Sequence, residues 1–165
     1  IMDGPPALTL GLEPNYSDLM RRKPTNRSEN IISKEMFIKI FSTGIFMSIV
    51  FLCQYRLNFL GAAQNEMRTV LFTLFVLFQL FNAFNCRELH DQTIFKHLFK
   101  NKLMLGVVGC TFVLQVLIIQ FAGAFFGTVP LGINMWLKIF ALAFSVIVLS
   151  EVVKAVIRVV EKAKK

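Results

Sequence analysis

The sequence predicts an all-α integral membrane protein. We expect a helical bundle of four transmembrane helices, arranged as two hairpins and preceded by the cytoplasmic end of another helix. Hydrophobic residues make up 55% of the 165 residues and charged residues only 17%, whereas soluble domains usually carry about a quarter charged residues. The apolar residues also gather into four long segments, each close to the ~20 residues that cross a bilayer as a helix.

The first part of the chain, residues 1–34, contains the end of a helix and a polar cytoplasmic loop. Pro5 and Pro6 interrupt the moderately apolar residues 1–12, and a regular helix cannot continue through two residues that lack a backbone N–H. Asp3 precedes these prolines. A carboxylate beside an unwound helix is what a cation site inside a membrane requires. Asp3 could equally cap a helix and face water.

Four membrane spans are expected within a transmembrane domain that comprises residues 35–153. They lie at about residues 36–55, 70–85, 103–121 and 135–153. In the first span, Gly44 and Ser48 form a stripe of small residues that would let another helix approach closely, unless their spacing is chance. Trp136, near the start of the fourth span, is expected to be an interfacial anchor. Residues 154–165 form a basic cytoplasmic tail that would lie near anionic lipid.

The positive charges indicate how the spans are oriented. The loop before the first span carries five Lys and Arg residues, the loop after the second span carries four, and the tail carries five, which is fourteen of the 18. The other two loops hold only Arg56 and Arg68. Because positive loops stay in the cytoplasm, both termini are expected there. The net charge of +8 is therefore a topology signal, and we expect the lipid bilayer and no nucleic acid as a partner.

A few polar side chains interrupt the apolar spans. Gln79 and Asn82 lie three apart on one face of the second span, and unpaired amides are costly in lipid. Their partners could be hydrogen-bonding groups on other helices or an ion pathway. Thr111 and Gln115 in the third span favour helix packing. The sequence contains no phosphate-binding loop and no nucleophile with a base, so this chain alone is expected to have no catalytic residues.

Several segments resemble the C-terminal membrane part of P-type cation-transporting ATPases, and most closely the calcium pumps. Residues 3–11, Asp-Gly-Pro-Pro-Ala-Leu-Thr-Leu-Gly, are similar to the end of the sixth transmembrane helix of that family. Residues 19–24 resemble the following cytoplasmic loop and residues 79–85 the eighth helix. Residues 119–123, together with Pro130, Leu131 and Trp136, resemble the ninth and tenth helices. The similarity covers essentially the whole chain in one order. It implies that the four spans are helices seven to ten.

The resemblance also implies an ion site. An Asp in the sixth helix binds the transported ion in this family, and Asp3 holds that position. In two-site calcium pumps of the endoplasmic reticulum a Thr precedes this Asp, and the eighth helix offers a Glu. The corresponding residues here are Met2 and Gln79, as in plasma-membrane-type pumps. We therefore expect one intramembrane Ca²⁺ site, with Asp3 as a ligand and with Gln79 and Asn82 as polar neighbours.

The function implied by the resemblance is that of a pump's C-terminal membrane portion, which braces the ion-binding helices in the cell membrane. Ca²⁺ would be the transported ion, and Mg²⁺ and ATP would bind to domains upstream of this chain. The upstream helices and cytoplasmic domains of the same pump are the expected partners. No long autoinhibitory tail follows the last span, which argues against calmodulin. The alternatives are a non-enzymatic membrane scaffold or subunit, and a P-type pump for Mn²⁺, Na⁺ or H⁺.

Overall fold

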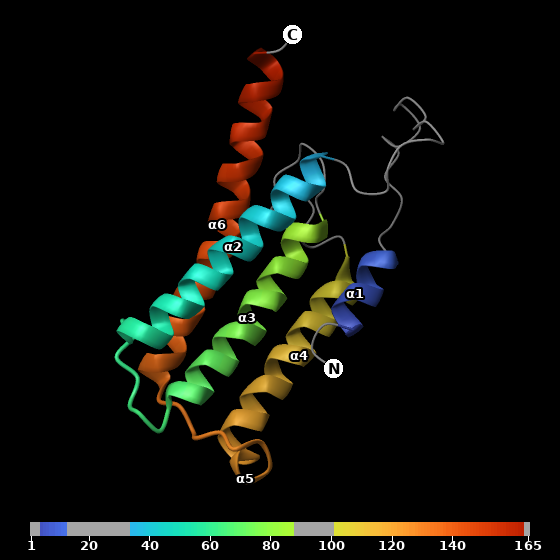
Figure 1. Cartoon of the computed structure of the whole chain (residues 1–165). Helices are drawn as coiled ribbons and strands as arrows, with labels where there is room; N and C mark the ends of the chain where they lie inside the picture. The colour runs from blue at the N-terminus through green and yellow to red at the C-terminus, as the bar shows by residue number, and fades with distance from the viewer. Residues whose placement is uncertain (1–3, 13–33, 88–100, 164–165) are drawn as a thin grey trace.

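A computed structural model of the chain describes residues 4–12, 34–87 and 101–163 (Figure 1). It contains the helices α1 (Gly4–Gly11), α2 (Lys34–Leu57), α3 (Met67–Arg87), α4 (Lys102–Phe121), α5 (Gly123–Phe126) and α6 (Ile133–Ala163). All regular secondary structure in these residues is helical. Four of the helices, α2, α3, α4 and α6, are long and apolar enough to cross a membrane. The predicted all-α membrane bundle with four spans is confirmed.

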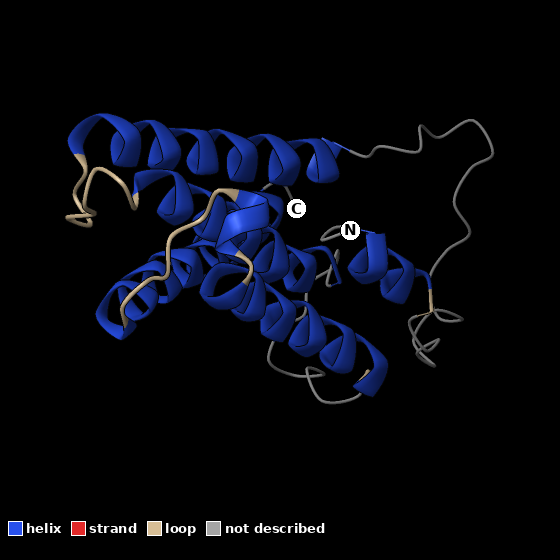
Figure 2. Ribbon diagram, turned by 90° about the horizontal axis from the view of Figure 1, so that it is seen from below, coloured by secondary structure: helices blue, strands red, loops and turns tan. Residues whose placement is uncertain are grey.

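The centre of the bundle is α3. It packs against α6, whose C-terminal part continues beyond the end of α3, and it also contacts α1, α2 and α4 (Figures 1 and 2). On α3, Leu74, Leu77 and Phe78 are almost completely buried, and they share one core with Ile139 and Ala143 of α6. The closest helix pair therefore joins the second and fourth spans, which are not consecutive in the chain.

The outermost span is α2. No residue of its 18-residue apolar stretch is buried, and large side chains such as Phe41, Ile45 and Leu52 are exposed. Gly44 and Ser48 are exposed as well, so no described helix packs against the predicted stripe of small residues. The hydroxyl of Ser48 donates instead to the carbonyl of Gly44 in the same helix, at 2.8 Å.

The loop between α2 and α3 is held by side chains rather than by regular structure. Asn58 has a left-handed backbone conformation, with φ of 44°, and its amide both donates to the Ala62 carbonyl (2.7 Å) and accepts from the Ala62 N–H (2.8 Å). The fully buried Gln54 accepts from the Leu60 N–H. From α6, the Lys138 amine donates to the Leu60 carbonyl at 2.7 Å. These contacts tie the loop to α2 and α6.

Replacing Asn58 with alanine is expected to destabilise the protein by about 2 kcal/mol, because three side-chain hydrogen bonds, two with Ala62 and one from the Gln54 amide, are lost together with a residue suited to positive φ. Asn58→Gly is the matched control, since glycine loses the same hydrogen bonds but tolerates positive φ. Thermal unfolding in detergent micelles should rank the midpoints as native, then glycine, then alanine. Equal midpoints for alanine and the native residue would show that this loop does not contribute to stability.

One expected anchor is not at the surface of the bundle. Trp136 is only 9% exposed, and its ring packs edge-on against Phe112 of α4, with 6.1 Å between the ring centroids. Phe112 also contacts Phe140 in the same way, at 6.2 Å. The indole fills space between α4 and α6 instead of lying on the outer surface, and the position of Trp136 at the membrane interface stays a prediction.

Candidate functional site

Asp3 lies outside the described residues, so its role as a cation ligand stays a prediction. The structure does describe α1, which begins at the next residue and packs against α4 and α3. Pro6 and Thr9 form the buried side of α1, and the Thr9 hydroxyl donates to the Pro6 carbonyl at 2.7 Å. The helix that follows Asp3 is thus held against the inner helices of the bundle.

Gln79 and Asn82 lie on α3, and both side chains are partly buried. Within the described part of the chain, neither amide makes a hydrogen bond. The interhelical partners expected for them are not found among these residues, and their place beside an ion site stays a prediction. They remain two amides on the central helix that α1 contacts.

The third span contains a more deeply buried amide than either of these. Gln115 has no exposed surface, and neither its Nε2 nor its Oε1 has a hydrogen-bond partner among the residues that the structure describes. Thr111, one turn away, donates its hydroxyl to the Val107 carbonyl of its own helix at 2.9 Å. An unpaired buried amide costs about 1–3 kcal/mol. Gln115 is therefore buried, as a packing residue would be, but its amide is left without a hydrogen bond among the described residues.

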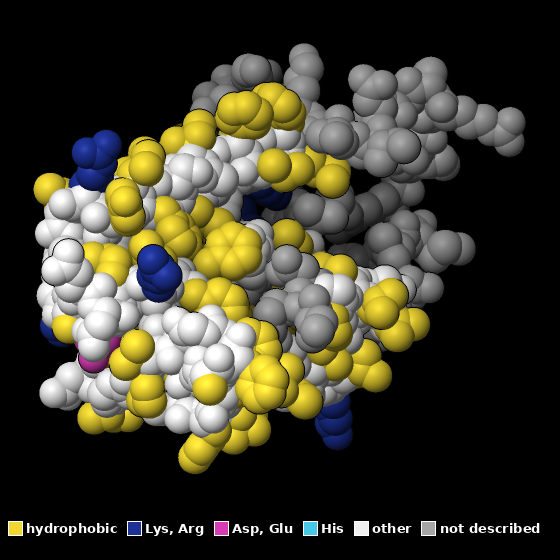
Figure 3. All heavy atoms as spheres, turned by 60° about the horizontal axis from the view of Figure 1, so that its bottom comes forward, with side chains coloured by type: hydrophobic (Ala, Val, Ile, Leu, Met, Phe, Trp, Pro, Cys, Tyr) yellow, Lys and Arg dark blue, Asp and Glu magenta, His cyan; other side chains and the backbone are white. Residues whose placement is uncertain are grey.

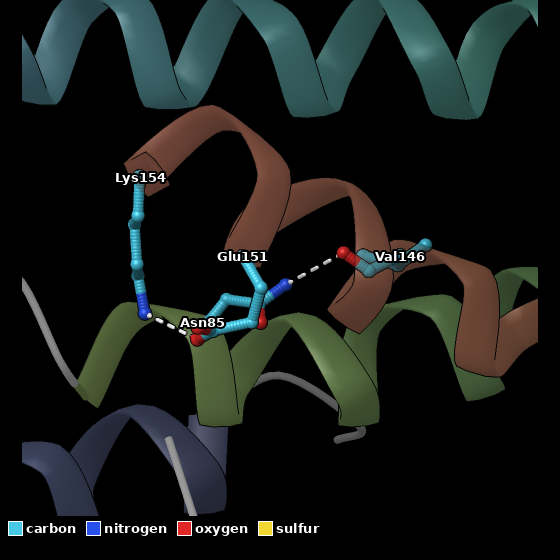
Figure 4. A network of polar contacts seen from close by, with 4 residues as sticks. All are labelled: Asn85, Val146, Glu151 and Lys154. Carbon is cyan, nitrogen blue, oxygen red and sulfur yellow. Dashed lines mark hydrogen bonds and ion pairs between the residues drawn. The ribbon is translucent and has the colours of Figure 1, made fainter. Parts of the chain in front are cut away.

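Sequence reasoning missed a polar cluster between α3 and α6. Asn85 donates from Nδ2 to the Val146 carbonyl at 3.3 Å, and the Lys154 amine pairs with the Glu151 carboxylate, also at 3.3 Å. Figure 4 shows these side chains together where α6 passes the end of α3. Lys154, which the sequence assigns to a basic tail, is only 3% exposed. The available signal was a Glu and a Lys three apart, directly after an apolar run.

The described residues do not assemble a metal site by themselves. No three His, Cys, Asp or Glu side chains lie together in this part of the chain, and Ca²⁺ takes six to eight oxygen ligands. The Glu151 carboxylate is already neutralised by Lys154. A Ca²⁺ site that involves this chain therefore needs ligands from outside the described residues, such as Asp3 or other segments of a longer polypeptide.

Comparison with known proteins identifies the family of this chain. Residues 1–156 match the family described as "Cation transporting ATPase, C-terminus", a match that covers nearly the whole chain. The chain belongs to this family. It is the C-terminal region of a cation-transporting ATPase and an integral membrane protein, and the predicted resemblance is confirmed.

The relatives of this ATPase region are much longer proteins. The chain is 30% identical over 162 residues to "Probable calcium-transporting ATPase 6, plasma membrane-type" of Oryza sativa, with 94% of the chain and 16% of the relative covered. It is 37% identical over 147 residues to "Calcium-transporting ATPase 10, plasma membrane-type" of Arabidopsis thaliana, with 83% of the chain and 14% of the relative covered. For "Plasma membrane calcium-transporting ATPase mca-1" of Caenorhabditis elegans the identity is 29% over 172 residues, with 94% and 14% covered. The chain thus spans 14–16% of their length.

Proposed function

We propose that the protein containing this chain is an ATP-driven pump that exports Ca²⁺ from the cytoplasm across the plasma membrane. The similarity along most of the chain to proteins named as plasma-membrane-type calcium-transporting ATPases carries this proposal. ATP and Mg²⁺ would bind to cytoplasmic domains outside this chain. The chain itself would contribute to ion binding and to the stability of the membrane domain.

The proposed pump has one intramembrane Ca²⁺ site, with Asp3 as a ligand. In support, α1 follows directly after Asp3 and packs against α3, the helix that carries Gln79 and Asn82. Both neighbours are neutral, and Met2 offers only a weak thioether acceptor. A second Ca²⁺ ion would require further negative oxygen ligands, so these residues favour a single ion.

We further propose that the bundle braces the ion-binding helices. The core shared by α3 and α6 is tightly packed, whereas α2 exposes large apolar side chains, including Phe41, Ile45 and Ile49. In the intact pump, other transmembrane helices of the same polypeptide would cover part of this surface and lipid would cover the rest. We also propose that both termini of the chain lie in the cytoplasm, which the excess of Lys and Arg in the flanking loops supports.

The experiment that tests this function is ATP hydrolysis by the intact protein in membrane vesicles, measured against Ca²⁺, Mn²⁺, Na⁺ and pH. We expect Ca²⁺ to stimulate hydrolysis with a Hill coefficient of about 1, as for a single site. Stimulation by Mn²⁺, Na⁺ or H⁺ without Ca²⁺ would show that the pump carries another cation. Absence of ATP hydrolysis under every condition would favour a non-enzymatic scaffold.

A further inference from the structure

The connection between α4 and α6 exposes an unusual group of large apolar side chains. Phe121 is 82% exposed, Phe125 94%, Phe126 58% and Ile133 72%. We call these four residues the aromatic tip. Phe125 and Phe126 lie in the single turn of α5, Phe121 ends α4 and Ile133 begins α6. The turn lies at the same end of the bundle as the loop between α2 and α3 (Figure 1). Figure 3 brings this end forward, and hydrophobic side chains cover much of the surface shown there.

The backbone under the aromatic tip is folded tightly. Ala122 accepts from the N–H groups of Phe125 and Phe126, and Gly123 accepts from the N–H of Thr128. A Cβ on Gly123 would lie 2.5 Å from the Thr128 carbonyl oxygen, so only glycine permits this close approach without a shift of the backbone. The exposed rings are therefore presented by a defined turn.

Two helices hold this turn in place through polar contacts. From α3, the Thr69 hydroxyl accepts from the Val129 N–H at 2.9 Å. From α4, the Gln120 amide donates to the Leu131 carbonyl at 2.9 Å. Irregular backbone is tolerated near lipid only where its polar groups are paired within the protein. These contacts meet that condition for two of the backbone groups in the connection.

The aromatic tip also lies in a part of the chain that carries no charge. No Asp, Glu, Lys, Arg or His occurs between residues 103 and 137. The loop between α2 and α3 at the same end differs, because Arg56, Glu66 and Arg68 lie in or beside it. The loop between α2 and α3 is thus suited to water, and the connection between α4 and α6 is suited to an apolar surrounding.

We propose that the aromatic tip is an interfacial membrane anchor, whose phenylalanines enter the boundary between the lipid headgroups and the acyl chains. The lipid bilayer is the occupant that the position favours, because the tip joins two candidate membrane spans directly and continues their apolar surface. Amphipathic elements at this depth bury apolar side chains in the boundary region. The anchor would fix the depth of α4 and α6 in the membrane through exposed rings, whereas the Trp136 indole packs against Phe112 inside the bundle.

The test is a pair of labelled variants of the intact protein in phosphatidylcholine vesicles. Phe125→Cys and Gln64→Cys are each made with the other cysteines replaced by serine, and labelled with an environment-sensitive fluorophore. Gln64 is exposed in the charged loop at the same end, so it is the matched control. Nitroxide-labelled phosphatidylcholine quenches fluorophores within the bilayer, and aqueous iodide quenches those in water.

At position 125 we expect a roughly twofold loss of fluorescence with nitroxide lipid and little effect of iodide, with the reverse at position 64. Strong iodide quenching at position 125 would place the tip in water and overturn the proposal. Weak quenching by both agents would show that protein covers the tip, either a second copy or another segment of the polypeptide, and would overturn it as well. Should Phe125→Cys fail to fold, Phe121→Cys offers a second exposed position.

Discussion

Replacing Asp3 with asparagine in the intact protein is expected to abolish Ca²⁺-dependent phosphoenzyme formation at micromolar Ca²⁺. Asparagine keeps the size of the side chain but removes its negative charge, and the affinity of an oxygen site for Ca²⁺ depends on the number of charged ligands. The Ca²⁺ concentration for half-maximal phosphorylation should rise by roughly 100-fold or more. The measurement is incorporation of labelled phosphate from ATP over a range of Ca²⁺ concentrations.

Gln79→Leu is the matched control for this experiment, because Gln79 is a neutral residue that we propose as a neighbour of the ion. Its effect on the Ca²⁺ dependence should stay below about 10-fold, the lower end of what outer residues contribute to a metal site. Both variants must reach the membrane in normal amounts. If Asp3→Asn kept the native Ca²⁺ dependence, Asp3 would cap a helix rather than bind the ion.

Replacing Glu151 with glutamine is expected to lower the free energy of unfolding by about 3 kcal/mol, the lower end of the range for breaking a buried ion pair. The reason is that Lys154 is 3% exposed and Glu151 25% exposed. Removing the carboxylate leaves a buried ammonium with no carboxylate beside it among the described residues. Thermal unfolding of the protein in detergent micelles measures the change.

The double variant Glu151→Gln with Lys154→Met separates the ion pair from other effects. Replacing both charges of a buried pair is often close to neutral, since the desolvation cost disappears together with the attraction. The double variant should therefore be more stable than Glu151→Gln alone. If the two were equally unstable, Glu151 would act through contacts other than its pair with Lys154.

Much of the fold follows from properties that act over short stretches of sequence. Each span is a run of apolar residues close to the length that crosses a bilayer, and a helix is the only open-ended structure that pairs all of its backbone groups in lipid. The prolines after Asp3 likewise act locally, and α1 begins at Gly4, directly before them. These features depend on composition and length, so they could be predicted without knowing which helices meet.

The surroundings of the polar side chains depend on distant parts of the chain, so local sequence does not predict them. Gln79 and Asn82 stand out in the sequence, yet they make no hydrogen bond in the described part of the chain, whereas Asn85 links α3 to α6. Gln115 lies one helical turn after Thr111 on α4, but it is completely buried and its amide has no hydrogen-bond partner among the described residues. Helical spacing places side chains on a face of a helix, but it does not identify the helix that covers that face.

What the sequence by itself determined is the class of this protein, its four spans, the family resemblance and the residues for which an ion site can be proposed. The tertiary structure alone decided that α3 pairs with α6, that Lys154 is buried, and that Phe125 rather than Trp136 is exposed. All four spans are apolar enough to enter a membrane. Yet in the 18-residue apolar stretch of each helix, none of the α2 residues is buried, whereas 44% of the α3 residues are. Lipid tails and helix interfaces are equally apolar, so hydropathy cannot distinguish them, and only the fit between side chains of distant helices decides which surfaces meet.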